Sequence, residues 1–248
     1  MTITATATFE GTDIYYRDSG GADPVPVLLV HGMGGDGRTW DRFARVLTAR
    51  GRRVIVADLR GHGRSAHTLS YLFREFGDDL LALCDHLGLT RVDLVGHSLG
   101  GHAVSLVAQT RPDLVRRLVL EEAPLPLREG EDLGALARRI PTPVELWHAG
   151  TSLLRSPRAV IAFDRSMTRS ALAQFRAPHP DWWDALPSMT ASTLLVTGGP
   201  RGMVDPDRLD AALAAIPDSR TVTIEVGHSV HRDRPREFAA TVAHFLVG

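Results

Sequence analysis

Apolar residues follow two different rhythms along the chain. Residues 3–9 alternate between apolar and threonine side chains, a polar turn follows at residues 10–13, and residues 14–16 are apolar or aromatic. This alternation predicts an N-terminal β-hairpin. After residue 21 the apolar residues instead form short continuous runs with helical stretches between most of them. Continuous runs are typical of strands buried on both faces, so the pattern predicts an α/β fold with a mainly parallel sheet and helices on both sides.

The expected elements of this sheet are short. Buried strands are expected at residues 25–30, 54–57, 92–95, 118–120, 194–196 and 222–226, and helices at residues 38–49, 71–87 and 99–109. The single cysteine of the chain, Cys84, lies among leucines of the helix expected at 71–87. A lone cysteine forms no internal disulfide, and we expect Cys84 to behave as a small buried apolar residue.

One long interval interrupts the alternation of strands and helices. The residues between Leu120 and Leu194 contain several prolines, helical patterns at 133–139 and 166–175, and the tryptophans Trp147, Trp182 and Trp183. We therefore expect residues 125–191 to form a mostly helical lid, inserted into a core made of residues 1–124 and 192–248. An irregular surface excursion is the alternative interpretation of the same residues.

Composition and charge narrow the class of protein. The 248 residues are 44% hydrophobic, which is enough for a sizeable core, and 28 basic residues nearly balance 29 acidic ones. A net charge of −1 offers no electrostatic footprint for nucleic acid or an anionic membrane. The N-terminus lacks the pattern of an export signal and no apolar run approaches a membrane span, so a soluble, cytoplasmic protein is expected. We expect no metal or organic cofactor, and the sequence leaves the oligomeric state open.

The strongest chemical signal is the segment GHSLGG at residues 96–101, which follows strand 92–95 and opens helix 99–109. A G-x-S-x-G segment between a strand and a helix is the pattern of a nucleophile elbow, in which the serine lies on a tight, strained turn. Neighbours two positions away on either side must lack bulk, and Gly96 and Gly100 meet this need. The turn would place the Ser98 hydroxyl at the carboxyl ends of the strands, so Ser98 is the candidate nucleophile.

A second signal is the segment HGMGG at residues 31–35, just after the first parallel strand. Its loop can direct the backbone N–H of Met33 towards a developing oxyanion, with the N–H of Leu99 as the second donor. His31 and Gly32 are expected to contact the substrate. The segment GMGGDG at 32–37 also matches a dinucleotide-binding pattern, with Asp58 about twenty residues further on. That alternative, an NAD(P)-dependent oxidoreductase, leaves the serine elbow unexplained.

A general base must come from a loop at the same end of the sheet as the nucleophile. The segment GHSVH at residues 227–231 follows the last expected strand and meets this requirement. His228 comes directly after the glycine and is the candidate base. We expect His231 to be a surface or lid contact.

These motifs, in this order, resemble those of the α/β-hydrolase superfamily over nearly the whole chain. The segment DLRGHGRS at residues 58–65 resembles a structural D-x-R-G-x-G-x-S segment of that family, so Asp58 receives no catalytic role. The resemblance implies an α/β-hydrolase fold, with a mainly parallel eight-stranded sheet and a helical lid. It also implies that Ser98 attacks a carbonyl carbon, that His228 takes its proton, and that a buried carboxylate orients the histidine.

The position of that carboxylate departs from the family pattern. The usual acid follows the strand at 194–196, but the matching position here is Arg201, which cannot accept a hydrogen bond. Glu122, at the end of the earlier strand, matches a position that certain superfamily members use, and we favour it. Asp205 is the alternative, although its position before Pro206 is typical of a helix N-cap. Glu121 is a third candidate on the opposite face of the strand.

A serine nucleophile with a histidine base implies acyl transfer to water through an acyl-enzyme. We expect a carboxylic ester, lactone or thioester as the small-molecule substrate, and a C–C bond is a further option. The lid residues Trp147 and Trp183 are expected to line an apolar substrate pocket, and His148 is a candidate polar contact. The displaced acid leaves open a non-hydrolytic member of the fold, such as a lyase, a biosynthetic cyclase or a ligand receptor.

Overall fold

The computed structural model describes residues 2–131 and 157–247, and these contain one eight-stranded sheet. Its strands are β1 (Ile3–Phe9), β2 (Thr12–Asp18), β3 (Val27–Val30), β4 (Val54–Ala57), β5 (Val92–His97), β6 (Val115–Glu121), β7 (Ser192–Thr197) and β8 (Ser219–Thr223), in the spatial order β1-β2-β4-β3-β5-β6-β7-β8. The hairpin β1–β2 is antiparallel and joins β4 in an antiparallel pair. The strands from β4 to β8 pair in parallel, which confirms the predicted fold class.

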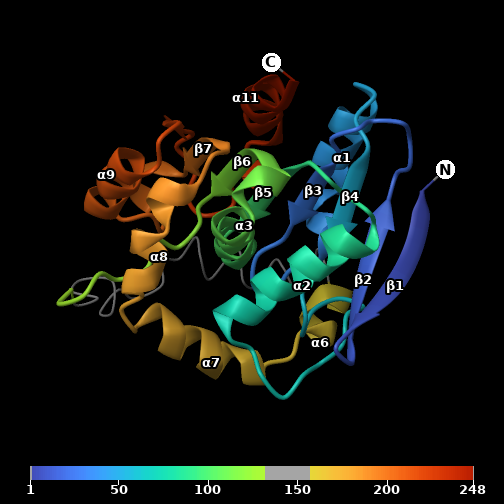
Figure 1. The fold of residues 1–248 in the computed structure, drawn as a ribbon, viewed down its shortest axis with the longest axis horizontal. Coiled ribbons are helices and arrows are strands. Elements are labelled where there is room, and N and C mark those ends of the chain that lie inside the picture. Colours follow the sequence, from blue (N-terminus) through green and yellow to red (C-terminus); the bar gives the residue numbers. More distant parts are fainter. Residues whose placement is uncertain (1, 132–156, 248) are drawn as a thin grey trace.

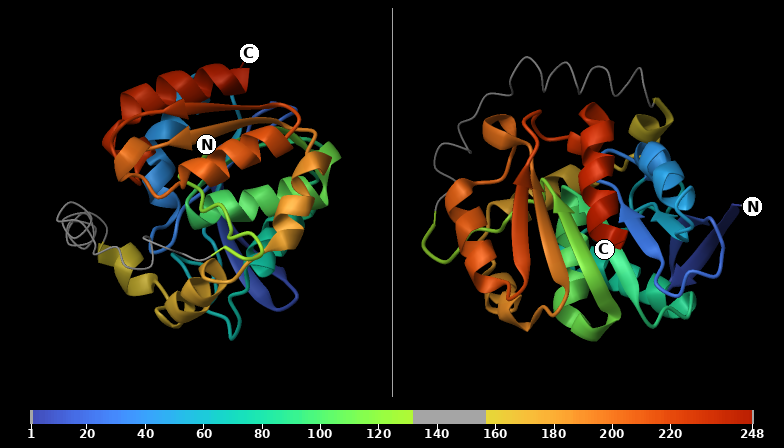
Figure 2. Two further views of the ribbon diagram at one scale, coloured as in Figure 1. Left: turned by 90° about the vertical axis from the view of Figure 1, so that its left-hand side faces the viewer. Right: turned by 90° about the horizontal axis from the view of Figure 1, so that it is seen from above.

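Helices cover both faces of this sheet. The core helices are α1 (Asp41–Thr48), α2 (Phe73–His86), α3 (Leu99–Thr110), α9 (Pro206–Ala215), α10 (Val230–Asp233) and α11 (Pro235–Val247). Short 3-10 turns occur at η1 (Gly37–Trp40), η2 (Pro112–Leu114), η3 (Leu186–Ser188) and η4 (Gly199–Arg201). Figure 1 shows α1 and α11 on one side of the sheet and α2 and α3 on the other, and in Figure 2 the red helix α11 lies over the sheet and runs roughly along its strands.

The strands separate two hydrophobic cores because successive side chains point to opposite faces. Leu28 and Val30 of β3 pack on one face with residues of α2 and α3, whereas Val27 and Leu29 pack on the other with residues of α1 and α11. All four are essentially inaccessible to solvent. Each such side chain contributes about 1.5–3 kcal/mol through burial, so the central strands hold both helical layers to the sheet.

Cys84 of α2 belongs to the core that contains α2 and α3, as predicted. Burial raises the pKa of its thiol to about 12, so the thiolate is scarcely populated at neutral pH. None of the helices in the described ranges is long and apolar enough to cross a membrane.

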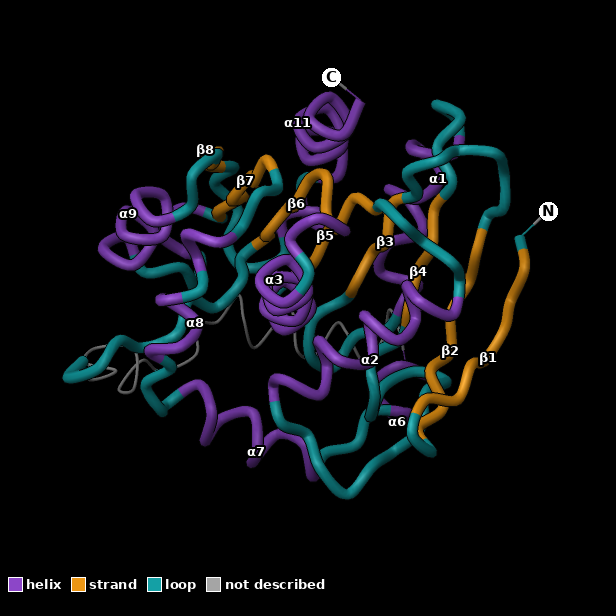
Figure 3. Tube along the Cα trace, in the orientation of Figure 1, coloured by secondary structure: helices purple, strands orange, loops and turns teal. Residues whose placement is uncertain are grey.

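Between β6 and β7 the described chain forms α6 (Pro157–Ala162), α7 (Ser166–Phe175) and α8 (Pro180–Asp184). The helix predicted at 166–175 is therefore present, while the one predicted at 133–139 lies outside the described residues. Figure 3 shows α8, α7 and α6 forming an arc below α3 and α2. The segment is attached to the core by Trp182, whose indole N–H donates to Ser105 Oγ at 2.9 Å, and by Asp164, whose N–H donates to the Gly61 carbonyl at 2.9 Å.

The last strand differs from its predicted position. The apolar run at 222–226 predicts a buried strand, whereas β8 spans Ser219–Thr223 and most of its residues are partly or fully exposed. As the edge strand of the sheet, β8 needs no continuous apolar run. Ile224 and Val226 instead lead the chain around the end of β7, where their N–H groups donate to the Thr197 and Gly198 carbonyls.

Candidate active site

Ser98 occupies a strained turn between β5 and α3. Its backbone has φ of 51° and ψ of −121°, a region that residues with a Cβ rarely adopt. The glycines on either side make this turn sterically feasible. A Cβ on Gly96 would lie 2.4 Å from the Gly100 carbonyl oxygen, and a Cβ on Gly100 would lie 2.4 Å from the His31 carbonyl oxygen. The local sequence therefore determines the position of Ser98, which is partly exposed, at the end of β5.

The His228 imidazole lies between Ser98 and Glu122. Its Nε2 is 3.0 Å from Ser98 Oγ, and its Nδ1 is 3.4 Å from Glu122 Oε2. The side chain is 27% exposed, so part of the ring is accessible to solvent. If Nδ1 carries the proton, Nε2 has the lone pair that can accept the proton of the Ser98 hydroxyl. The structure thus brings together the serine, the histidine and the favoured acid predicted from sequence.

Glu122 follows β6 directly and is almost completely buried. Its backbone adopts a positive φ of 46°, which turns the side chain towards β7 and the loop that follows it. The carboxylate accepts hydrogen bonds from the backbone N–H of Gly198 at 2.6 Å and of Met203 at 2.5 Å. These two donors replace the water lost on burial and hold the carboxylate beside His228.

The loop after β7, where the usual acid is absent, is shaped to receive Glu122. A Cβ on Gly202 would lie 2.3 Å from Glu122 Oε1, so a larger residue there would occupy the space of the carboxylate. Asp205 lies elsewhere: it is the N-cap of α9, and its Oδ1 accepts the Arg208 N–H at 3.1 Å. No hydrogen bond or ion pair joins Asp205 to His228 in the described part of the chain, and Asp205 serves the capping role that its position before Pro206 indicates.

The loop after β3 approaches the nucleophile closely. A Cβ on Gly32 would lie 3.0 Å from Ser98 Cβ and 2.7 Å from His97 Nδ1, so only glycine lets this backbone pass beside the elbow. Met33 is 39% exposed, whereas Leu99, the first residue of α3, is buried. Their backbone N–H groups come from the two segments that meet at Ser98, which is the arrangement expected of two oxyanion donors.

The expectation that His31 contacts the substrate is wrong, because its side chain is completely buried. Its Nδ1 is 2.8 Å from the Gly32 carbonyl oxygen and its Nε2 accepts the Leu59 N–H at 3.1 Å. His62 supports the same loop, since its Nε2 accepts the Gly34 N–H at 3.1 Å. Burial lowers the pKa of His62 to about 3, so the ring stays neutral and keeps this acceptor at neutral pH.

A second histidine–carboxylate pair lies behind the first. The expectation that His231 is a surface or lid contact is also wrong, since this side chain is 2% exposed and its Nδ1 is 2.8 Å from Glu121 Oε2. The backbone N–H of His231 donates to Glu121 Oε1 at 2.8 Å. Burial raises the pKa of Glu121 to about 7 and lowers that of His231 to about 3. The neutral imidazole therefore donates its Nδ1–H to Glu121.

These contacts hold the loop that carries His228. The backbone N–H of His231 is bonded to Glu121, and His97 Nε2 donates to the His228 carbonyl oxygen at 2.8 Å. Burial lowers the pKa of His97 to about 3, so this ring is also neutral. Among the described residues His97, Glu121 and His231 offer possible metal-ligand atoms within 4.8 Å of one another. We interpret the cluster as hydrogen-bonded support, because these contacts already engage the carboxylate and His97 Nε2.

Comparison with known proteins identifies the family of this chain. The model of the alpha/beta hydrolase fold family matches residues 25–189, about two thirds of the chain. The chain belongs to the α/β-hydrolase family. Among curated α/β-hydrolase relatives, the sn-1-specific diacylglycerol lipase ABHD11 of Mus musculus is 28% identical, over 92% of this chain and 82% of that protein. Lipase LipV of Mycobacterium tuberculosis is also 28% identical, over 93% of this chain and 96% of its own.

Solved structures agree with the family assignment. A hydrolase from Pseudomonas aeruginosa superimposes with a TM-score of 0.81 at 26% identity, covering 99% of this chain and 98% of that chain. Est816, described as an N-acyl homoserine lactone degrading enzyme, superimposes with a TM-score of 0.77 at 26% identity, covering 97% and 100%. The relatives and the similar solved structures thus include proteins named as lipases, a hydrolase and a lactone-degrading enzyme.

The segment 58–65 of this α/β-hydrolase has the structural role predicted for it. Asp58 Oδ1 accepts the Gly37 N–H at 2.7 Å and Oδ2 accepts the Arg64 N–H at 2.9 Å, so the carboxylate joins two loops. Arg60 donates to both oxygens of Asp79 on α2, at 2.6 and 2.8 Å. Because both oxygens of Asp58 are occupied, the acid that the dinucleotide-binding alternative would need for a ribose is already engaged.

The tryptophans expected to line a substrate pocket have different outcomes. Trp147 and His148 lie outside the described residues. Trp183 is partly buried against the α2–α3 core, its indole N–H donates to the Pro126 carbonyl at 3.1 Å, and the Arg128 guanidinium lies 4.8 Å above its ring. These contacts attach the α8 segment to the chain that follows β6, so the structure gives Trp183 a packing role.

Proposed function

We propose that this protein is a serine hydrolase that cleaves a carboxylic ester, lactone or thioester through an acyl-enzyme on Ser98. His228 is the general base and Glu122 the carboxylate that orients it. The observation that carries the proposal is the position of the His228 ring, 3.0 Å from Ser98 Oγ and 3.4 Å from Glu122 Oε2. Hydrogen bonds of this kind are often long before substrate binds and shorten in the complex.

In the acylation step, Ser98 Oγ attacks the carbonyl carbon of the substrate while its proton moves to His228 Nε2. The carbonyl π electrons move to oxygen, and the backbone N–H groups of Met33 and Leu99 stabilise the oxyanion. Glu122 stabilises the imidazolium that forms. When the tetrahedral intermediate collapses, the bond to the leaving group breaks and His228 returns the proton to the departing alcohol or thiol.

In the second half of the reaction, water replaces the serine as nucleophile. His228 removes a proton from the water, whose oxygen attacks the acyl carbon, and the collapse of the second intermediate returns that proton to Ser98 Oγ. A carboxylic acid leaves. Each oxyanion donor is worth about 10²–10³ in rate in enzymes of this kind, so the approach of the Gly32 loop to Ser98 adds to the contribution of the triad.

The names of the relatives support the class of bond that we propose for the substrate, but they do not identify the substrate itself. Their names include a diacylglycerol lipase, a second lipase and a lactone-degrading enzyme, all of which act on ester bonds. Cleavage of such bonds requires an activated nucleophile, which Ser98 on its strained turn and the neighbouring His228 can supply. A C–C bond next to a carbonyl group could be cleaved by the same nucleophile.

Covalent labelling with a fluorophosphonate, read by intact-protein mass, tests the activated serine. The expected result is a single adduct on the wild type, formed as the Ser98 oxygen displaces fluoride from phosphorus, and none on Ser98→Ala. Ser188→Ala is a matched control, because Ser188 is exposed and its hydroxyl only donates to the Ala185 carbonyl. This control should label like the wild type.

Absence of an adduct on folded wild-type protein would contradict the proposal, as would equal labelling of Ser98→Ala. Labelling without hydrolysis of p-nitrophenyl esters, thioesters or lactones would instead indicate that the activated serine serves a non-hydrolytic reaction, as in a lyase or a cyclase.

A further inference from the structure

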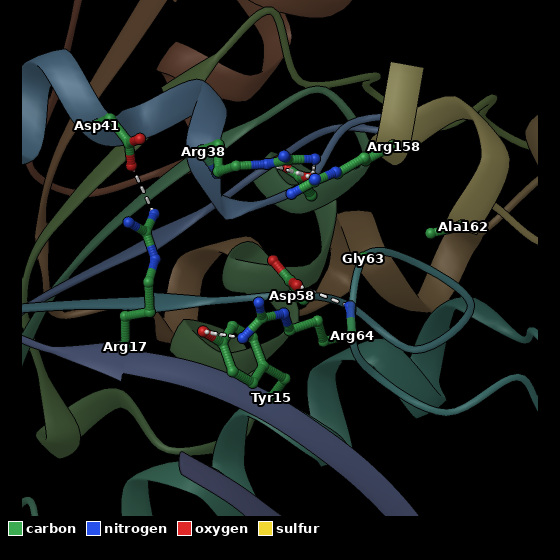
Figure 4. A pocket seen from close by; sticks show the side chains of 10 residues that line it. Tyr15, Arg17, Arg38, Asp41, Asp58, Gly63, Arg64, Arg158 and Ala162 are labelled. Atoms are coloured by element: carbon green, nitrogen blue, oxygen red, sulfur yellow. Dashed lines mark hydrogen bonds and ion pairs between the residues drawn. The ribbon is translucent and has the colours of Figure 1, made fainter. Parts of the chain in front are cut away.

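A pocket of about 380 Å³, lined mostly by arginine and aspartate residues, lies apart from the proposed catalytic residues. It is bordered by β2, the loop after β3, η1, the start of α1, the loop after β4 and helix α6. Its lining among the described residues is Tyr15, Arg17, Asp36, Arg38, Asp41, Asp58, Gly63, Arg64, Arg158 and Ala162. Figure 4 shows the side chains of Arg17, Arg38, Arg64 and Arg158 extending into this space from different elements. None of the residues assigned to the proposed triad or oxyanion hole lines it.

The carboxylates of this pocket already have partners. Asp41 accepts from Arg17 at 2.6 Å, and Asp36 accepts from Arg38 at 2.5 Å. Asp58 accepts from two backbone N–H groups, as described above, and is 5% exposed. The acids of the lining are therefore neutralised by arginine or saturated by backbone donors.

Two arginines of the pocket have no such partner in the described chain. Arg64 Nη1 donates to the Tyr15 hydroxyl oxygen at 3.2 Å and its guanidinium lies 5.0 Å above the Tyr15 ring, but within the described residues it meets no carboxylate. Arg158 on α6 is exposed and makes no hydrogen bond or ion pair with residues 2–131 or 157–247. Among the described residues of the lining, four arginines face three aspartates, which gives a formal charge of +1, and Arg64 and Arg158 both belong to this cavity.

We infer that this pocket binds the phosphate group of a small phosphorylated metabolite. A phosphate monoester has three terminal oxygens and up to two negative charges, so it can accept from two guanidinium groups at once. The Tyr15 hydroxyl accepts from Arg64 and keeps its own proton to donate to a third oxygen. A single carboxylate matches one guanidinium fork and would leave the other arginine unpaired, which favours phosphate over a carboxylate.

The location gives such binding a structural consequence. Arg64 lies in the loop whose His62 accepts the Gly34 N–H next to the proposed oxyanion hole, and Arg158 lies on α6 of the predicted lid. A ligand held by both arginines would connect α6 to the loop that supports Gly34. The binding proposal itself does not depend on the hydrolase activity, because it involves none of the catalytic groups.

Isothermal titration calorimetry with ribose 5-phosphate tests the site on the intact chain, with ribose as the neutral probe and succinate as the carboxylate probe. The expected result is binding of ribose 5-phosphate that weakens as salt rises, with no binding of ribose. Arg64→Gln and Arg158→Gln should each weaken binding about tenfold or more, since each removes a charge-assisted contact. Arg74→Gln is the matched control, because Arg74 is an exposed arginine of α2 outside the pocket.

Circular dichroism of each variant separates lost binding from lost folding. The inference is overturned if the wild type binds no ribose 5-phosphate at millimolar concentration, or if the Arg74→Gln control weakens binding as much as the pocket variants do. Succinate binding as tight as that of the phosphate would refute the phosphate assignment. Failure of this test with normal fluorophosphonate labelling would leave the proposed hydrolase intact, so the two proposals are separable.

Discussion

Replacing Glu122 with glutamine tests whether this residue is the acid of the triad. The substitution keeps the size of the side chain and removes its charge. The carboxylate accepts from two backbone N–H groups, Gly198 at 2.6 Å and Met203 at 2.5 Å, and it lies 3.4 Å from His228 Nδ1. A glutamine has only one oxygen, so its amide nitrogen must face one of these donors or the imidazole N–H.

Two separate losses follow from this geometry. An unpaired donor in a buried site costs about 1–3 kcal/mol, so the free energy of unfolding should fall by that amount. The imidazolium formed during catalysis also loses its counter-charge and its orienting acceptor, and in serine hydrolases this loss lowers kcat by about 10²–10⁴. That range corresponds to about 3–5 kcal/mol of transition-state stabilisation.

The assay measures kcat for a p-nitrophenyl ester and the rate of fluorophosphonate labelling, at a temperature where urea titration shows each variant to be folded. Asp205→Asn is the matched comparison. Asparagine is as good a helix cap as aspartate, so the free energy of unfolding of this variant should be almost unchanged. Its kcat should stay within about a factor of two of the wild-type value. Near-normal kcat in Glu122→Gln together with a large loss in Asp205→Asn would transfer the role to Asp205, and normal kcat in both would refute the triad.

Two further predictions concern the surroundings of this acid. Gly202→Ala places a Cβ 2.3 Å from Glu122 Oε1, so we expect a destabilisation of about 1–3 kcal/mol and a lower kcat. The control is Gly88→Ala, at an open position with positive φ, which should lower stability without affecting kcat. An unchanged kcat in Gly202→Ala would contradict the close approach of Gly202 to the carboxylate. Glu121→Gln should change how the free energy of unfolding depends on pH. Burial raises the pKa of Glu121 from 4.5 to about 7, so the folded wild type prefers the protonated form of this residue. The stability that comes from this preference is fully present below about pH 4.5 and is lost as the pH rises through 7. Relative to the variant, the wild type should therefore lose about 3 kcal/mol between those limits, measured by urea unfolding across the range, and parallel pH profiles would refute the shifted ionisation.

The elbow and the sheet were predictable because their causes are local. Gly96 and Gly100 are required by backbone atoms only a few residues away or on the neighbouring strand, and the apolar runs of β3 to β7 reflect burial on both faces. His228 was also predictable, although its strand was placed several residues too late. Only its position at the carboxyl end of the sheet mattered, and the turn around the end of β7 preserves that position.

The roles of His31, His231 and Trp183 were not predictable in the same way. We expected His31 to contact the substrate and His231 to lie at the surface or the lid, yet both side chains are buried. Their hydrogen-bond partners come from distant segments: Leu59 for His31, and Glu121 for His231. Such pairs leave no spacing pattern in the sequence. Trp183 likewise packs against Arg128 and the Pro126 carbonyl, contacts that depend on how the chain after β6 returns to the core.

The two neighbouring acids at the end of β6 contact two different histidines of the candidate site. Glu121 still belongs to the strand and points to the side of His231, while Glu122 turns away through its positive φ and reaches His228. The first carboxylate thus bonds to the loop that carries the proposed base, and the second lies beside that base. Because the loop after β7 supplies two N–H donors and a glycine instead of an acid, it receives a carboxylate from its neighbour. Arg201 stands where the family's usual acid is expected, and the loop around it instead accommodates Glu122, which is why we propose Glu122 for the role rather than interpret this sequence as an incomplete triad.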